Sequence, residues 1–124
     1  MQNKKDVLSM RDYAAVTQWF RDNGWKEVPV SRIYDHDLDF FKKFPDAPKC
    51  KTNAPKPLQL RAKIWDHQKY DATMPIGVEI ELHAKPVKDD GWVAIKAHGF
   101  SSIEDVPRQC ERLIKAWSAI CEDD

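Results

Sequence analysis

The sequence predicts an α+β fold, in which an antiparallel sheet of three or four strands carries an N-terminal and a C-terminal helix on one face. Residues 58–64, 76–84 and 93–97 alternate apolar with polar side chains, which is typical of half-buried strands. A C-terminal segment instead repeats apolar residues at steps of three and four, which place them on one stripe of a helix. These residues are Ile103, Val106, Cys110, Leu113, Trp117 and Ile120.

The bulk composition limits the class of protein. A chain of 124 residues fits a single α+β domain, 1–124, of which we expect residues 1–7 to be disordered. Lys and Arg number 20 and Asp and Glu number 20, and the net charge of +0 disfavours a general nucleic-acid binder. The three cysteines form no Cys-x-x-Cys pair, which indicates a reducing compartment. With neither a signal peptide nor a long apolar run, the sequence predicts a cytoplasmic protein without a membrane partner.

The first helix has sequence signals at both ends. Ser9 is followed three residues later by Asp12, which has the form of a capping box, so we expect the helix to begin at Ser9. Gly24 is expected to end it, because glycine readily adopts the left-handed conformation of a helix C-terminus.

The next thirty residues give weaker signals. Residues 25–33 predict an extended segment at a sheet edge, since Pro29 cannot donate a hydrogen bond to a neighbouring strand. Residues 37–44 predict a short helix that buries its three phenylalanines and ends at Pro45. Residues 45–57 predict a basic, proline-rich loop in which Lys49 and Lys51 flank Cys50. This loop is either a plain connection or a contact with phosphates or an acidic protein surface.

The alternation of the strands also predicts what lies on the face away from the helices. Turn residues at 89–91 would join the last two strands and set Glu81 opposite Lys96 and Glu79 opposite His98. The first reading of this face is a solvated surface held by charge pairs. The second is a binding surface, because aromatic anchors with basic neighbours are typical of hot spots and also suit base stacking. Its candidate partner-binding residues, together with those of the loop, are Trp65, Trp92, Arg61, Lys63, Lys96, Lys49 and Lys51.

Candidate metal and catalytic residues are sparse. Asp35, His36 and Asp37 are suitable ligand types, but we expect acidic residues here to stabilise a helix N-terminus. His83 and His98 are expected to approach each other on the outer face, yet two histidines fall short of the three ligands of a catalytic zinc site. The sequence therefore predicts no cofactor, no metal and no catalytic residue.

Several short segments are distinctive when taken together: Trp25, Phe44-Pro45, Pro48, Cys50, Asn53, VEIEL at 78–82, GWVxIKAxG at 91–99 and Ala116-Trp117. In this combination they resemble small uncharacterised proteins encoded by bacteriophages and prophages. The resemblance spans residues 25–121 and departs at His98, where an aromatic residue is expected. It implies a phage origin and a role in the host cell cytoplasm, often as a binder of a host component or an inhibitor of host defence.

Three functional hypotheses follow. The first is a non-enzymatic protein that binds and occludes a host protein or nucleoprotein complex, such as a component of a bacterial defence system like CRISPR. The alternative is a module that binds nucleic acid weakly through the basic loop and the tryptophan-bearing sheet face. A third, an enzyme or metalloprotein built on Asp35, His36 and Asp37, has the least support.

Overall fold

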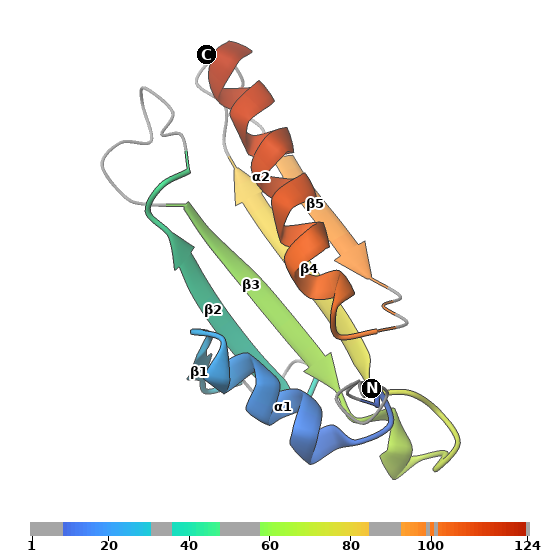
Figure 1. Cartoon of the computed structure of the whole chain (residues 1–124). Coiled ribbons are helices and arrows are strands. Elements are labelled where there is room, and N and C mark those ends of the chain that lie inside the picture. Colours follow the sequence, from blue (N-terminus) through green and yellow to red (C-terminus); the bar gives the residue numbers. More distant parts are fainter. Residues whose placement is uncertain are drawn as a thin grey trace, which may run out of the picture.

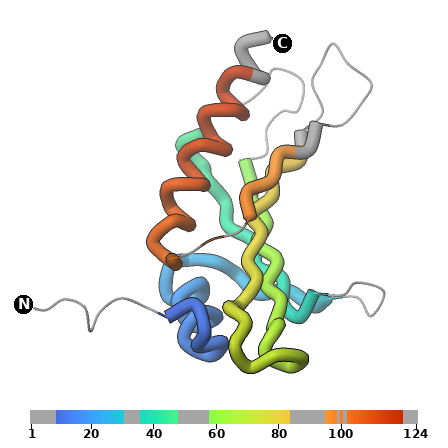
Figure 2. Tube along the Cα trace, turned by 90° about the vertical axis from the view of Figure 1, so that its right-hand side faces the viewer, coloured from blue at the N-terminus to red at the C-terminus, as the bar shows by residue number. Residues whose placement is uncertain are grey.

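Five antiparallel strands form one sheet in the order β1-β2-β3-β4-β5, so each strand lies beside its neighbour in the chain. The structure, a computed structural model, describes residues 9–30, 36–47, 58–84, 93–98, 100 and 102–123, without the side chains of 84, 93–94 and 120–123. Both α-helices lie on the same face of the sheet (Figures 1 and 2). The elements are α1 (Tyr13–Asp22), β1 (Lys26–Val28), β2 (Leu38–Phe44), β3 (Leu58–Trp65), the 3-10 turn η2 (His67–Lys69), β4 (Gly77–Ala84), β5 (Val93–His98) and α2 (Asp105–Asp123).

The α+β class is confirmed, but the predicted number of strands is too low, because β2 was expected to be a helix. Leu38 and Phe40 face the core, whereas Asp39 and Phe41 project from the opposite face. The two adjacent phenylalanines hide this alternation in the sequence. All seven residues of β2 pair with β3, and this distant pairing overrides the local preference.

The start of α1 also differs from the prediction. The N-cap is Asp12, whose carboxylate accepts a hydrogen bond from the backbone N–H of Ala15 at 3.0 Å. Ser9 forms the preceding turn, because its hydroxyl accepts from Arg11 and its carbonyl accepts from the backbone N–H of Asp12. The prediction of Ser9 as N-cap is therefore wrong by one turn.

The end of α1 is as predicted. Gly24 has a φ of 87°, a left-handed conformation that glycine adopts without strain. The backbone N–H of Trp25 donates to the carbonyl of Phe20, and that of Gly24 donates to Arg21, which is the Schellman pattern. The rings of Trp25 and Phe20 lie 5.3 Å apart, so the capping turn also joins the core.

The core lies between the sheet and the helices. Phe20 of α1 stacks on Phe40 of β2 with ring centroids 5.2 Å apart, and both are fully buried. α2 packs against β4 and β5. The predicted helix stripe is buried from Ile103 through Trp117. The last residue of the stripe, Ile120, has a side chain outside the described part of the structure. The N-terminal half therefore extends the sheet through β1 and β2 and leaves the opposite face clear of α1 and α2.

Neither described helix has the length and apolar content that crossing a membrane requires.

Candidate functional site: the outer face of the sheet

The outer face is the sheet surface that points away from α1 and α2 (Figure 2). Residues paired across neighbouring strands share a face, so the strand register determines its membership. Glu81 pairs with Lys96 and Glu79 pairs with His98, as predicted. Two cross-strand rows make up the centre of this face: Lys26, Phe41, Arg61, Glu81 and Lys96 in one, and Val28, Asp39, Lys63, Glu79 and His98 in the other.

Asp39 is the centre of a first charged cluster. Arg61 binds it with two hydrogen bonds, Nε to Oδ1 at 2.9 Å and Nη2 to Oδ2 at 2.8 Å. The Nε2 of His36 lies 3.0 Å from the same carboxylate, whose residue is only 3% exposed. Burial alone would raise the pKa of Asp39, but the bonds to Arg61 and His36 outweigh it and lower the pKa. The bidentate pair fixes the position of Arg61 against the sheet.

Glu81 is the centre of a second cluster. It is 1% exposed although it lies on the outer face, because long basic side chains surround its carboxylate. The Nζ of Lys63 lies 2.9 Å from it and that of Lys96 lies 3.4 Å from it, and His83 Nε2 approaches to 3.3 Å. Burial would raise the pKa of Glu81, but the contact with Lys63 and the surrounding positive charge hold it below the ordinary value.

Trp65 lies at the end of β3, where the outer face meets a hollow of about 530 Å³. Its half-buried ring contacts His36 edge-on, with centroids 5.7 Å apart. Gly77 lies beside this hollow and leaves room for His67. A Cβ at position 77 would lie 2.6 Å from Nε2 of His67, so a larger residue here would force the imidazole to move. Met74, Glu79 and His98 also line the hollow.

The structure brings together four of the predicted partner-binding residues. Trp65, Arg61, Lys63 and Lys96 all lie on the outer face, and the three basic side chains each make an ion pair there. The other three predicted residues, Trp92, Lys49 and Lys51, lie outside the described residues.

The histidines and acids that suggested a metal have other roles. Asp37 accepts hydrogen bonds from the backbone N–H of Asp66 and from Lys69, which links the start of β2 to the end of β3. The helix-terminus explanation for this acidic segment is wrong, because the segment leads into a strand. His83 pairs with Ala94 and His98 with Glu79, so the two histidines are about 13 Å apart along the sheet and do not meet.

Within the described ranges, no group of three or more His, Cys, Asp or Glu side chains is placed to hold a metal ion. Asp35 and Cys50 lie outside these ranges. Cys110 is buried, and burial raises the pKa of its thiol to about 11, as expected for an inert core cysteine.

Among the outer-face residues that sequence reasoning missed are Lys26, Asp39, Phe41 and Lys43. All four belong to β1 or β2, and all but Lys26 fall in the segment expected to be helical. The only local signal is the alternation of Asp39 with Leu38 and Phe40, which the adjacent Phe41 obscures.

No protein-family model matches this chain, and neither a curated protein nor a solved structure shows significant similarity to it. The resemblance to phage proteins therefore stays an expectation from sequence.

Proposed function

We propose that this protein binds a protein partner with the outer face of its sheet and acts by occluding that partner, without catalysing a reaction. The observation that carries the proposal is the ordered charge network on a face that neither α1 nor α2 covers. Asp39 and Glu81 hold Arg61, Lys63 and Lys96 in fixed positions before any partner arrives. Preorganised side chains lose less conformational entropy on binding, which favours affinity.

The balance of charge on this face favours a protein over a nucleic acid. Three carboxylates, those of Asp39, Glu79 and Glu81, lie among the three basic side chains. A phosphate backbone would meet these carboxylates as like charges, whereas a protein surface of mixed charge matches both signs. Trp65 lies beside the hollow at the end of β3 and supplies an aromatic anchor of the kind that dominates protein interfaces.

The resemblance to phage proteins supports a bacterial host protein, or a nucleoprotein complex such as a CRISPR-type defence machine, as the partner. A host lysate containing such a system is therefore the appropriate source for a capture experiment.

The test is a pull-down with the full chain, with and without nuclease, comparing three variants. We expect the partner to be retained after nuclease by the parent and by Arg112→Glu, an exposed change on α2 away from the outer face. We expect Lys96→Glu and Trp65→Ala to lose it, with thermal melts showing that each variant remains folded. Capture that disappears with nuclease would favour the nucleic-acid alternative, and equal capture by all variants would exclude the outer face as the interface.

A further inference from the structure

The corner of the sheet where β1 ends carries a second feature. β1 pairs only with residues 39–41 of β2, whereas β2 continues through Lys42–Phe44 beside β3. Within the described residues, this part of β2 therefore has a neighbouring strand on one side only. A hollow of about 580 Å³ lies here, and Lys26, Phe41, Lys42, Lys43 and Gln59 line it.

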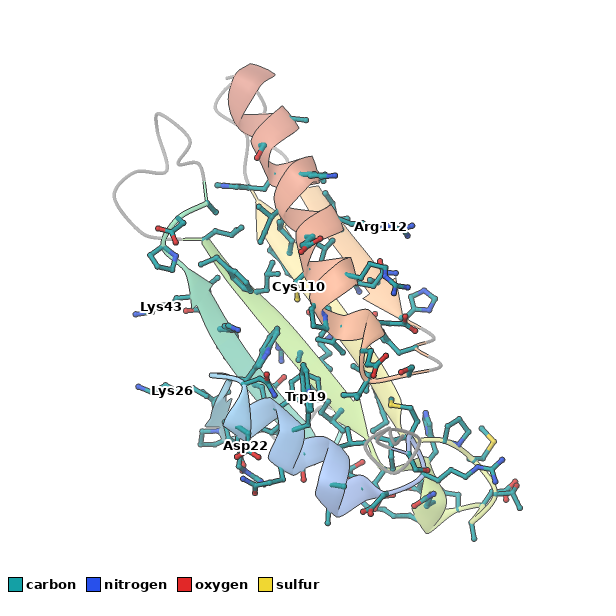
Figure 3. All side chains as sticks on the ribbon, viewed as in Figure 1. Trp19, Asp22, Lys26, Lys43, Cys110 and Arg112 are labelled. Atoms are coloured by element: carbon teal, nitrogen blue, oxygen red, sulfur yellow. The ribbon has the colours of Figure 1, made fainter. Side chains whose placement is uncertain are left out.

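The register places four of these side chains in one block on the outer face. Lys26 pairs with Phe41, and Lys43 pairs with Gln59. Phe41 and Lys43 are two residues apart on β2 and so project from the same face. Lys26 is thus a diagonal neighbour of Lys43, at about 7–8 Å between the backbones. Figure 3 shows both lysines extending beyond the same edge of the sheet.

The charge at this corner is not neutralised as it is at the centre of the face. Among the described residues, no carboxylate lies within ion-pair distance of Lys26 or Lys43, both of which are exposed. The nearby Glu27 is already paired with Arg21 at 2.6 Å. Lys42 points to the other face, where its Nζ donates a hydrogen bond at 2.9 Å to the carbonyl of Asn23, the C-cap residue of α1.

We propose that this basic corner binds the phosphate of a nucleotide unit, with Lys26 and Lys43 contacting the phosphate and Phe41 contacting the base. Two ammonium groups that pair with no carboxylate in the described part of the chain suit a phosphate, which needs only accessible lysines. The half-buried ring of Phe41 between them favours a nucleotide over an acidic peptide, because every base has a face that stacks on an aromatic ring. Gln59 adds an amide that donates and accepts at the same hollow.

The bound nucleotide unit is either a free mononucleotide or part of a single strand. The affinity for a strand has a defined dependence on the salt concentration. Each neutralised phosphate on a single strand contributes about −0.7 to the slope of log K against log salt, so the one phosphate that Lys26 and Lys43 contact contributes roughly −0.7. This corner lies at the β1 end of the same outer face as the protein interface proposed above, and Phe41 contacts Arg61 of that interface, with the guanidinium carbon 5.9 Å from the ring centroid. Its test nevertheless needs no protein partner.

The test measures fluorescence anisotropy of a labelled ten-nucleotide oligouridine with the full chain over a series of salt concentrations. We expect Lys26→Gln/Lys43→Gln to weaken binding about tenfold at low salt and to flatten the slope by roughly 0.7. The matched control is Arg112→Gln/Lys115→Gln, which removes the same charge from exposed positions on α2 and should leave both quantities unchanged. Thermal melts verify the fold of each variant.

Phe41→Leu distinguishes a nucleotide site from a site for any anion. This substitution should weaken oligouridine binding several-fold while leaving the salt slope unchanged, because it removes stacking and no charge. If unlabelled uridine monophosphate displaces the labelled probe as well as unlabelled oligouridine does, the ligand is a free nucleotide. If only unlabelled oligouridine displaces the probe, the ligand is a single strand. Inorganic phosphate that competes as well as the nucleotide, with no effect of Phe41→Leu, would overturn the proposal, as would equal loss in the Arg112/Lys115 control.

Discussion

Replacing Glu81 with Gln is the sharpest test of the charge network on the outer face. The substitution preserves the size and shape of the side chain but removes its charge. The basic groups of Lys63 and Lys96 then lose a carboxylate at 2.9 Å and 3.4 Å. The effect on folding therefore reports how much the buried carboxylate stabilises the sheet.

The burial of each partner limits the magnitude. Breaking a fully buried ion pair costs about 3–5 kcal/mol, whereas an exposed pair contributes at most about 1 kcal/mol. The Glu81 side chain is 1% exposed and that of Lys63 is 18% exposed, so this pair lies close to the buried limit. The Lys96 side chain is 46% exposed, so solvent screens its attraction to Glu81. We expect Glu81→Gln to lower the free energy of unfolding by about 2–3 kcal/mol, between these two limits.

Urea unfolding at neutral pH measures this difference, with Glu79→Gln as the matched control on the same strand and face. Glu79 is 15% exposed and lies 3.8 Å and 4.0 Å from the two lysines, so its replacement should cost no more than about 1 kcal/mol. Equal losses in the two variants, or no loss in Glu81→Gln, would refute a specific role for the buried carboxylate.

The difference should also depend on pH. The folded pKa of Glu81 lies below its ordinary value of 4.5, so its stabilising contribution is fully present above 4.5 and disappears as the pH falls through the folded pKa. The gap between the parent and Glu81→Gln should therefore close in acid. A gap that stays constant well below 4.5 would show that lost packing, not lost charge, causes the destabilisation.

Three further predictions address the helices. Leu113→Ala and Trp117→Ala should each lower the free energy of unfolding by about 2–5 kcal/mol in urea melts, and unchanged melts would mean that the stripe of α2 is not core. Asp12→Ala should cost about 1 kcal/mol through loss of the N-cap, while Ser9→Ala should change stability by less than about 0.5 kcal/mol, and the reverse order would restore Ser9 as the cap. Cys110 is buried and the pKa of its thiol is raised to about 11, so it should react with a thiol reagent only as the protein unfolds. Mass spectrometry of peptides that shows fast labelling at Cys110 in the native protein would contradict its burial.

Elements with a local and unambiguous pattern could be predicted from the amino-acid sequence alone. β3, β4 and β5 follow from strict alternation, and α2 follows from a stripe that repeats every three to four residues. The pairing of Glu81 with Lys96 was also predicted, because a turn expected at residues 89–91 sets the register of the two strands, and the structure confirms the pair. Gly24 was a clear stop signal for α1, since its positive φ suits glycine.

The strand conformation of β2, and with it the organisation of the outer face, depends on contacts between segments that are distant in the sequence. Phe40 and Phe41 are adjacent and both apolar, so the period of this segment cannot be read from the segment alone. Its strand conformation depends on pairing with β3, and the Arg61–Asp39 bonds join residues 22 positions apart. The pairing of β2 with β1 places Phe41 beside Lys26, with Lys43 as a diagonal neighbour, and this corner has no neutralising carboxylate among the described residues. Contacts between segments distant in sequence have no local periodic signature, so the charge pairs and the basic corner emerge only when the sheet is assembled.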